Sequence, residues 1–193
     1  INSLKEINRV LKKGGYFGAI WNYDCPSSAQ KSNSVKSSKN FIIEGPKKEF
    51  YEQYAAQHFD DPTDVSFKYF EQSPWAVDVA QYVYQFDVNV PQYRHAKWRT
   101  VLEDKDARDY FSDIISENYL LTLTTSAENE VFELWKTRSY ITLLPEEKQE
   151  EIKVHLEKLL KEKVTEDVVV SETDGVRVLR KALGTHTVVL QAK

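Results

Sequence analysis

Basic and aromatic residues that could bind an anion are concentrated between positions 91 and 98. This segment contains Arg94, His95 and Trp98. An arginine can hold a carboxylate through two parallel hydrogen bonds, so the segment is a candidate site for an anionic molecule. The alternative is an ordinary solvated surface with an arginine stacked on an aromatic ring. The residues by themselves favour this second interpretation.

A second arginine, Arg138, follows an apolar stripe at helical spacing that ends at Trp135. An arginine at the end of a buried stripe requires a partner. That partner is either a core carboxylate or helix carbonyl group, or a substrate anion near Tyr140, whose hydroxyl can donate. A hydroxyl or amine substrate would also need a general base, for which His95 and Tyr140 are the candidates.

These side chains must be positioned by ordered elements, the clearest of which spans residues 3 to 22. Ser3 and Glu6 have the spacing of a capping box and predict the start of an amphipathic helix. Gly14 can end that helix in the left-handed conformation. Residues 16 to 21 are apolar or small on both faces, which predicts a strand covered on both sides, as in an α/β sheet.

The string EINRVLKKGGYFGAIWNYD resembles the segment before and through the fifth strand of class I S-adenosylmethionine-dependent methyltransferases, in the small-molecule branch that includes trans-aconitate methyltransferase. A second segment, residues 137 to 152, resembles the post-core helix of the same family. Together they cover about a fifth of the chain, in the family's order. The residues that match in the first segment are Arg9, Val10, Leu11, Gly14, Gly15 and Trp21.

The resemblance implies the C-terminal part of a Rossmann-like α/β sheet, with an added helical cap and antiparallel C-terminal strands. It implies methyl transfer to a small molecule, with a carboxylate-bearing acceptor suggested by the trans-aconitate branch. We expect the substrate site at the end of the first strand, with contributions from the basic segment and the later helix. The expected substrate-binding residues are Trp21, Asn22, Tyr23, Arg94, His95, Trp98, Arg138 and Tyr140.

The cofactor, S-adenosyl-L-methionine, is expected to bind mostly outside these residues. The family's glycine-rich turn follows its first strand, whereas Gly14, Gly15 and Gly18 precede and enter a strand. We therefore expect the chain to be a fragment that begins just after the family's fourth strand and is inactive alone. Its expected partners are the missing N-terminal half or another copy of itself.

Three regions are predicted. Residues 1 to 26 would end the methyltransferase core, 27 to 118 would form a flexible loop and helical cap, and 119 to 193 would complete the core. Within them, the serine-rich segment 27 to 40 is a surface loop or a lid over the site. Helices are predicted at 47 to 59 and from Pro74 and Pro145. Strands are predicted at 119 to 125 and 168 to 171, followed by an Asp174-Gly175 turn, and as a hairpin turning at Gly184.

Composition limits the function further. The 193 residues carry a net charge of −4 with both signs interspersed, which argues against a nucleic-acid or anionic-membrane surface. The single cysteine, Cys25, allows no internal disulfide, so a cytoplasmic setting is expected. No residues have metal-ligand spacing. The alternative function is a catalytically inactive, methyltransferase-like interaction module. A nicotinamide-dependent oxidoreductase would share the type of sheet, but no segment after the first strand supports that function.

Overall fold

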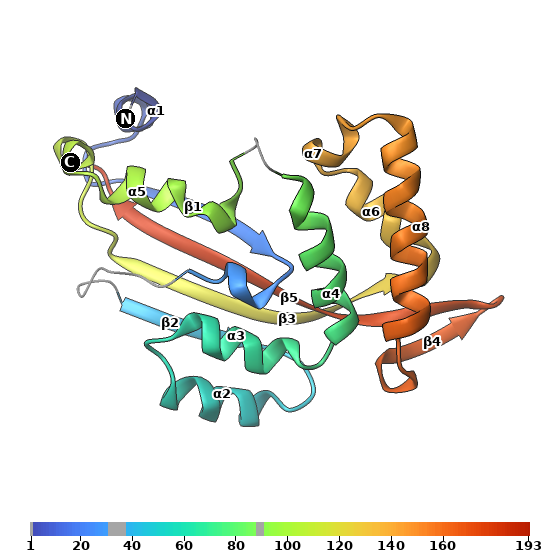
Figure 1. The fold of residues 1–193 in the computed structure, drawn as a ribbon. Helices are drawn as coiled ribbons and strands as arrows, with labels where there is room; N and C mark the ends of the chain where they lie inside the picture. Colours follow the sequence, from blue (N-terminus) through green and yellow to red (C-terminus); the bar gives the residue numbers. More distant parts are fainter. Residues whose placement is uncertain (1, 31–37, 88–90) are drawn as a thin grey trace.

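A computed structural model describes residues 2–30, 38–87 and 91–193 and shows a mixed α/β fold (Figure 1). Five strands form one mixed sheet in the order β1-β5-β3-β2, and β4 pairs with the first half of β5. β5 is antiparallel to β1, β3 and β4, whereas β2 and β3 are parallel. The strands are β1 (Tyr16–Tyr23), β2 (Ser38–Ile43), β3 (Ser116–Ala127), β4 (Val169–Thr173) and β5 (Val176–Gln191).

Eight α-helices are assigned within the described ranges. They are α1 (Asn2–Val10), α2 (Lys48–Gln57), α3 (Pro62–Phe70), α4 (Pro74–Val83), α5 (Lys97–Glu103), α6 (Val131–Lys136), α7 (Ser139–Thr142) and α8 (Glu146–Lys163). Short 3₁₀ turns at Pro26–Ser28 and Tyr93–His95 matter for the site described below. None of the helices in the described ranges combines the length and apolarity that a membrane span requires.

The strand register places most of the buried side chains of the sheet on one face. One cross-strand row is Tyr23, Gly184, Leu121 and Ile43, and the next on that face begins with Trp21 and His186. Two core clusters cover this face, with α1 and α5 over its β1 end and α2 and α3 over its centre. A third cluster packs α4, α6 and α8 against Leu179, which alternates to the other face of β5.

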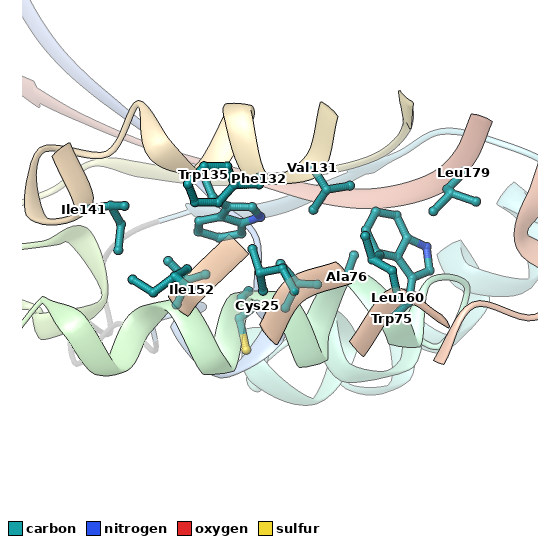
Figure 2. Close-up of a cluster of buried hydrophobic side chains, with 14 of the residues drawn as sticks. Cys25, Trp75, Ala76, Val131, Phe132, Trp135, Ile141, Ile152, Leu160 and Leu179 are labelled. Atoms are coloured by element: carbon teal, nitrogen blue, oxygen red, sulfur yellow. The ribbon is translucent and has the colours of Figure 1, made fainter. Parts of the chain in front are cut away.

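The helix-rich cluster contains the largest aromatic side chains of the core (Figure 2). Trp75 from α4 is 2% exposed and donates from Nε1 to the carbonyl of Arg180 in β5, at 2.9 Å. Trp135 from α6 packs near Ile152 of α8. Burial of each such side chain contributes about 1.5–3 kcal/mol, so this cluster fixes α6, and the residues that follow it, against the sheet.

On the opposite face, α6 and α8 cover only the first part of β5 around Leu179, and the part formed by β1, β2 and the strand segments beside them, here called the bare face, has no helix over it in the described part of the chain. Tyr16 and Ile20 in β1 are 63% and 69% exposed, and Ile42 in β2 is 46% exposed. The prediction of a strand covered on both sides is therefore wrong for this chain. The apolar residues on the second face of β1 are real, but the described residues place helices over β1 on one face only.

β5 runs without interruption through Gly184, where the sequence predicted a hairpin turn. The register pairs Gly184 with Tyr23 of β1 and with Leu121 of β3. A Cβ at position 184 would lie 2.0 Å from Cζ of Tyr23. The glycine therefore marks a close approach of an aromatic ring to the strand and not a reversal of the chain.

The other C-terminal turn is confirmed. Asp174 and Gly175 have φ values of 53° and 77° and join β4 to β5. Two consecutive left-handed residues suit the twist of an antiparallel hairpin.

The helices predicted from Pro74 and Pro145 are confirmed, but other local predictions need correction. The helix α3 is not among the predicted elements; its first turn holds Pro62, and its N-cap, Asp61, accepts from Asp64 N–H at 3.2 Å. Ser3 lies inside α1, and Glu6 pairs with Arg9 instead of forming a capping box. Side-chain pairing with a nearby arginine therefore replaces backbone capping there.

The predicted loop at 27 to 40 is only partly a loop. Residues 31–37 lie outside the described residues, and with them half of the proposed lid. The described ends are ordered, since Ser28 closes a 3₁₀ turn and positions 38 to 40 belong to β2, which pairs in parallel with β3.

Candidate functional site

A small recess lies where β1 ends, between the 3₁₀ turn at Tyr93–His95 and the start of α7. Its volume is about 30 Å³. It is lined by Asn22, Tyr23, Asp24, Ser28, Tyr84, Gln92, Tyr93, Arg94, Arg138 and Tyr140. Five of the eight predicted substrate-binding residues are in this lining, namely Asn22, Tyr23, Arg94, Arg138 and Tyr140.

The first charged group of the recess is Asp24, which directly follows β1. Its carboxylate is 3% exposed and is bound by two cations. Arg138 donates from Nη2 to Oδ2 at 2.8 Å, and Lys181 of β5 lies 2.8 Å from Oδ1. Trp135 contacts both cations, with its ring centre 5.2 Å from Cζ of Arg138 and 5.7 Å from Nζ of Lys181. The buried carboxylate is thus neutralised, and Arg138 has the core carboxylate partner that the sequence allowed.

The second charged group is Arg94. It contacts the carboxylate of Asp87, which is 7% exposed, and its Cζ lies 3.7 Å from the ring centre of Tyr84. The Tyr140 ring centre is 5.8 Å from the same Cζ. Arg94 is therefore held by an ion pair and by aromatic faces, so its guanidinium has a fixed position at the recess.

His95 supports this ion pair and does not face the recess. Gln92 N–H donates to Nδ1 at 3.2 Å, and Nε2 lies 3.0 Å from Oδ2 of Asp87. Because Nδ1 accepts, the proton of the neutral ring is on Nε2, which faces the carboxylate. Desolvation, aided by Arg94 and Lys97, lowers the pKa of His95, so the ring is neutral. With both nitrogens engaged, His95 is not placed to act as a general base.

Tyr140 and Tyr23 contribute rings to the recess. Burial raises the pKa of Tyr140, although the nearby Arg94 and Arg138 oppose the shift, so its hydroxyl is a donor at neutral pH. The Tyr23 hydroxyl points away and lies 2.9 Å from Oγ of Ser66 in α3. The Tyr23 ring is therefore a wall of the recess and its hydroxyl belongs to the core.

Trp21 and Trp98 lie behind the recess and do not line it. Their ring centres are 4.3 Å apart, and each ring also packs on Tyr93, which does line the recess. Trp98 donates from Nε1 to the Tyr93 carbonyl at 3.1 Å. These two predicted residues thus hold Tyr93 in place.

A buried ionic network continues behind Tyr93 and was missed by the sequence analysis. The Tyr93 hydroxyl lies 2.8 Å from Nδ1 of His186, and Nε2 of His186 lies 3.2 Å from Oε2 of Glu117. Arg99 of α5 donates to both oxygens of Glu117, at 3.3 and 3.1 Å. His186 and Glu117 are 0% exposed. A carboxylate only accepts, so His186 donates from Nε2 and accepts the Tyr93 hydroxyl at Nδ1.

Burial lowers the pKa of His186, and the hydrogen bond and charge of Glu117 only partly offset this effect. The histidine is therefore neutral and Tyr93 keeps its proton, because burial also raises the pKa of Tyr93. The network fixes the orientation of Tyr93. One signal in the sequence pointed to it, namely that Glu117 and His186 are polar residues inside otherwise apolar strands.

Ser28 is the most unusual polar group of the recess. The residue is 2% exposed, and among the described residues its Oγ has no hydrogen-bond partner. A buried hydroxyl without a partner costs about 1–3 kcal/mol. Nothing in the spacing of the six serines that follow Pro26 distinguishes Ser28 from the others.

A groove of about 300 Å³ lies elsewhere, between α6, α8 and the β4–β5 hairpin. Its floor includes Phe132, Leu156 and Leu160, and at its rim Arg177 and Glu128 form two hydrogen bonds of 2.7 Å. It is larger than the recess, but it contains none of the predicted site residues. The recess is therefore the stronger candidate.

Within residues 2–30, 38–87 and 91–193, no three His, Cys, Asp or Glu side chains are grouped so that they could hold a metal ion. No family model, curated protein or solved structure matches this chain.

Proposed function

We propose that this chain supplies the substrate side of an S-adenosylmethionine-dependent methyltransferase that acts on a small molecule. The observation that carries the proposal is the meeting of Asn22, Tyr23, Arg94, Arg138 and Tyr140 around one recess. These residues were selected from two resembling segments and a basic segment that are far apart in the sequence. An arrangement that brings them together at the end of β1 supports a common role.

The sheet gives further support. The resemblance implies a last strand that is antiparallel to its neighbours, and β5, which contains the predicted last strand, is antiparallel to both β1 and β3. This arrangement favours a Rossmann-like methyltransferase sheet over an unrelated α/β fold. The helices α2 to α5 would then form the cap of the substrate site.

The described residues do not fit the cofactor. A recess of about 30 Å³ is far too small for a nucleoside. Gly175 follows β4 and has no atom within 4 Å of an added Cβ, but it turns the chain into the antiparallel strand β5 and does not begin a helix. Gly45 follows β2, but a Cβ there would lie 3.1 Å from Leu123. The proposal therefore assigns cofactor binding to residues outside this chain. The bare face of the sheet and the outer edge of β1 are where that part, or a second copy, would pack.

The test uses the full-length product of the gene. We expect calorimetry to detect S-adenosylmethionine binding and an assay with a labelled methyl group to detect transfer to a small acid. The 193-residue chain alone should show no thermal shift with the cofactor, because ligand at 100 times its dissociation constant would add about 2.7 kcal/mol. Failure of the full-length protein to bind the cofactor would contradict the proposal.

The second candidate is an inactive interaction module, and the bare sheet face favours it. The part of that face formed by β1, β2 and the strand segments beside them carries no charged side chain among the described residues, and it includes the exposed Tyr16, Ile20 and Ile42. Large exposed apolar patches mark interaction surfaces. The two candidates differ in one measurement, since an inactive module predicts that the full-length protein binds a protein partner but not the cofactor.

A further inference from the structure

The recess has room for one functional group. A water molecule needs about 10–15 Å³ of such volume, so a recess of about 30 Å³ holds roughly two water-sized atoms. Asn22 is exposed, and the Arg138 side chain is 42% exposed, so the recess opens to solvent beside them. A ligand can therefore insert a head group of about two oxygen atoms while the rest of the molecule remains outside.

The charges around the recess leave one positive charge uncompensated. Arg94, Arg138 and Lys181 are cations, whereas Asp24 and Asp87 are the carboxylates that they contact. Each oxygen of the Asp24 carboxylate already faces a cation, so Asp24 presents little repulsion to an entering anion. An additional negative group would bring the site to neutrality.

Ser28 is the independent indication of a ligand. Its hydroxyl is buried, lines the recess and has no hydrogen-bond partner among the described residues. A hydroxyl can donate to an oxyanion. Arg138 uses Nη2 on Asp24, and a guanidinium has five N–H donors, so it can bind a second carboxylate as well.

We propose that the recess binds a single carboxylate group, which accepts hydrogen bonds from the Ser28 hydroxyl and the Arg138 guanidinium beside Arg94 and Tyr140. The planar group has two oxygens that match the available volume, whereas a tetrahedral phosphate is too large. The link to catalysis rests on the proposed function, because the carboxylate would belong to the methyl acceptor. Binding itself requires neither the cofactor nor methyl transfer.

The test is a titration of the 193-residue chain with sodium acetate, followed by NMR and controlled with equal concentrations of sodium chloride. Acetate is a small ligand, and we expect a dissociation constant on the order of 1 mM. Ser28→Ala should weaken acetate binding about tenfold, the usual effect of losing a hydrogen bond to a charged group. Ser27→Ala is the matched control, because Ser27 is an exposed neighbour that forms a hydrogen bond with Cys25 and does not line the recess.

The outcomes separate this inference from the proposed function. Arg138→Lys keeps the charge but loses the planar guanidinium, and it should also weaken acetate binding. Sodium phosphate should shift the recess signals no more than chloride does. Absence of acetate binding in a folded sample, equal losses for Ser28→Ala and Ser27→Ala, or tighter binding of phosphate would each overturn the inference. None of these results would affect the cofactor measurements on the full-length protein.

Discussion

The contact between Gly184 and Tyr23 leads to a quantitative prediction. A Cβ at position 184 would lie 2.0, 2.2 and 2.5 Å from three carbons of the Tyr23 ring. Gly184→Ala must therefore displace a ring that is 1% exposed and that is hydrogen-bonded to Ser66. Overpacking costs about 1–3 kcal/mol and a lost hydrogen bond about 1 kcal/mol. We expect a total destabilisation of about 2–4 kcal/mol.

The measurement is urea unfolding followed by circular dichroism. Gly18→Ala is the matched control, because Gly18 lies in neighbouring β1 with no atom within 4 Å of an added Cβ. It should leave stability unchanged or raise it by up to about 1 kcal/mol. Adding Tyr23→Ala to Gly184→Ala should cost much less than the sum of the single changes, because the clash is removed. Equal effects of Gly184→Ala and Gly18→Ala, or additive costs in the double variant, would refute the reasoning.

Three further predictions concern the buried network and the bare face. The pKa of His186 is lowered in the folded protein, so the unfolded chain binds more protons below about pH 6.5 and wild-type stability should fall as the pH drops through that value. His186→Gln should make the denaturation midpoint depend less on pH between pH 5 and 8. Equal pH dependence of the midpoints in the wild type and the variant would contradict this. Glu117→Gln should cost about 3 kcal/mol by leaving Arg99 under-compensated, whereas Glu103→Gln, at a more exposed partner of Arg99, should cost under about 1 kcal/mol by the same unfolding assay. The chain should self-associate through its bare face. Ile20→Lys should shift the molecular mass measured by light scattering toward that of the monomer and change the free energy of unfolding by no more than about 0.5 kcal/mol. A monodisperse wild-type monomer would count against this prediction.

Much of the fold could be predicted because local rules and the final structure agree. The strand ending in Tyr23 follows from its apolar run, and the helix after Pro145 from its periodic leucines. The hairpin at Asp174 and Gly175 follows from turn chemistry. Where the prediction was wrong, a distant contact decided the structure. Gly184 has the composition of a turn, but its role is set by a tyrosine ring on another strand.

The recess was partly predictable for a similar reason. An arginine after a buried stripe needs a partner, and this rule selected Arg138 before its partner Asp24 was known. The network behind Tyr93 could not be assembled from spacing, because Glu117 is 18 residues from Arg99 and 69 from His186. The strand register brings Glu117 and His186 into adjacent rows, and the packing of α5 on the sheet brings Arg99 to them. Ser28 was missed because its burial depends on packing that the serine-rich segment does not indicate.

The central position of β5 has a consequence for synthesis on the ribosome. β5 is the last of the five strands in chain order, yet it pairs with β1, β3 and β4. While translation is in progress, β1 has no partner among the other described strands, and only the parallel pair β2 and β3 can form. Long-range pairing of this kind slows folding and leaves apolar strands exposed in the nascent chain. The sheet is therefore assembled late, around its final strand, and a chaperone that shields β1 until then would raise the yield of native protein.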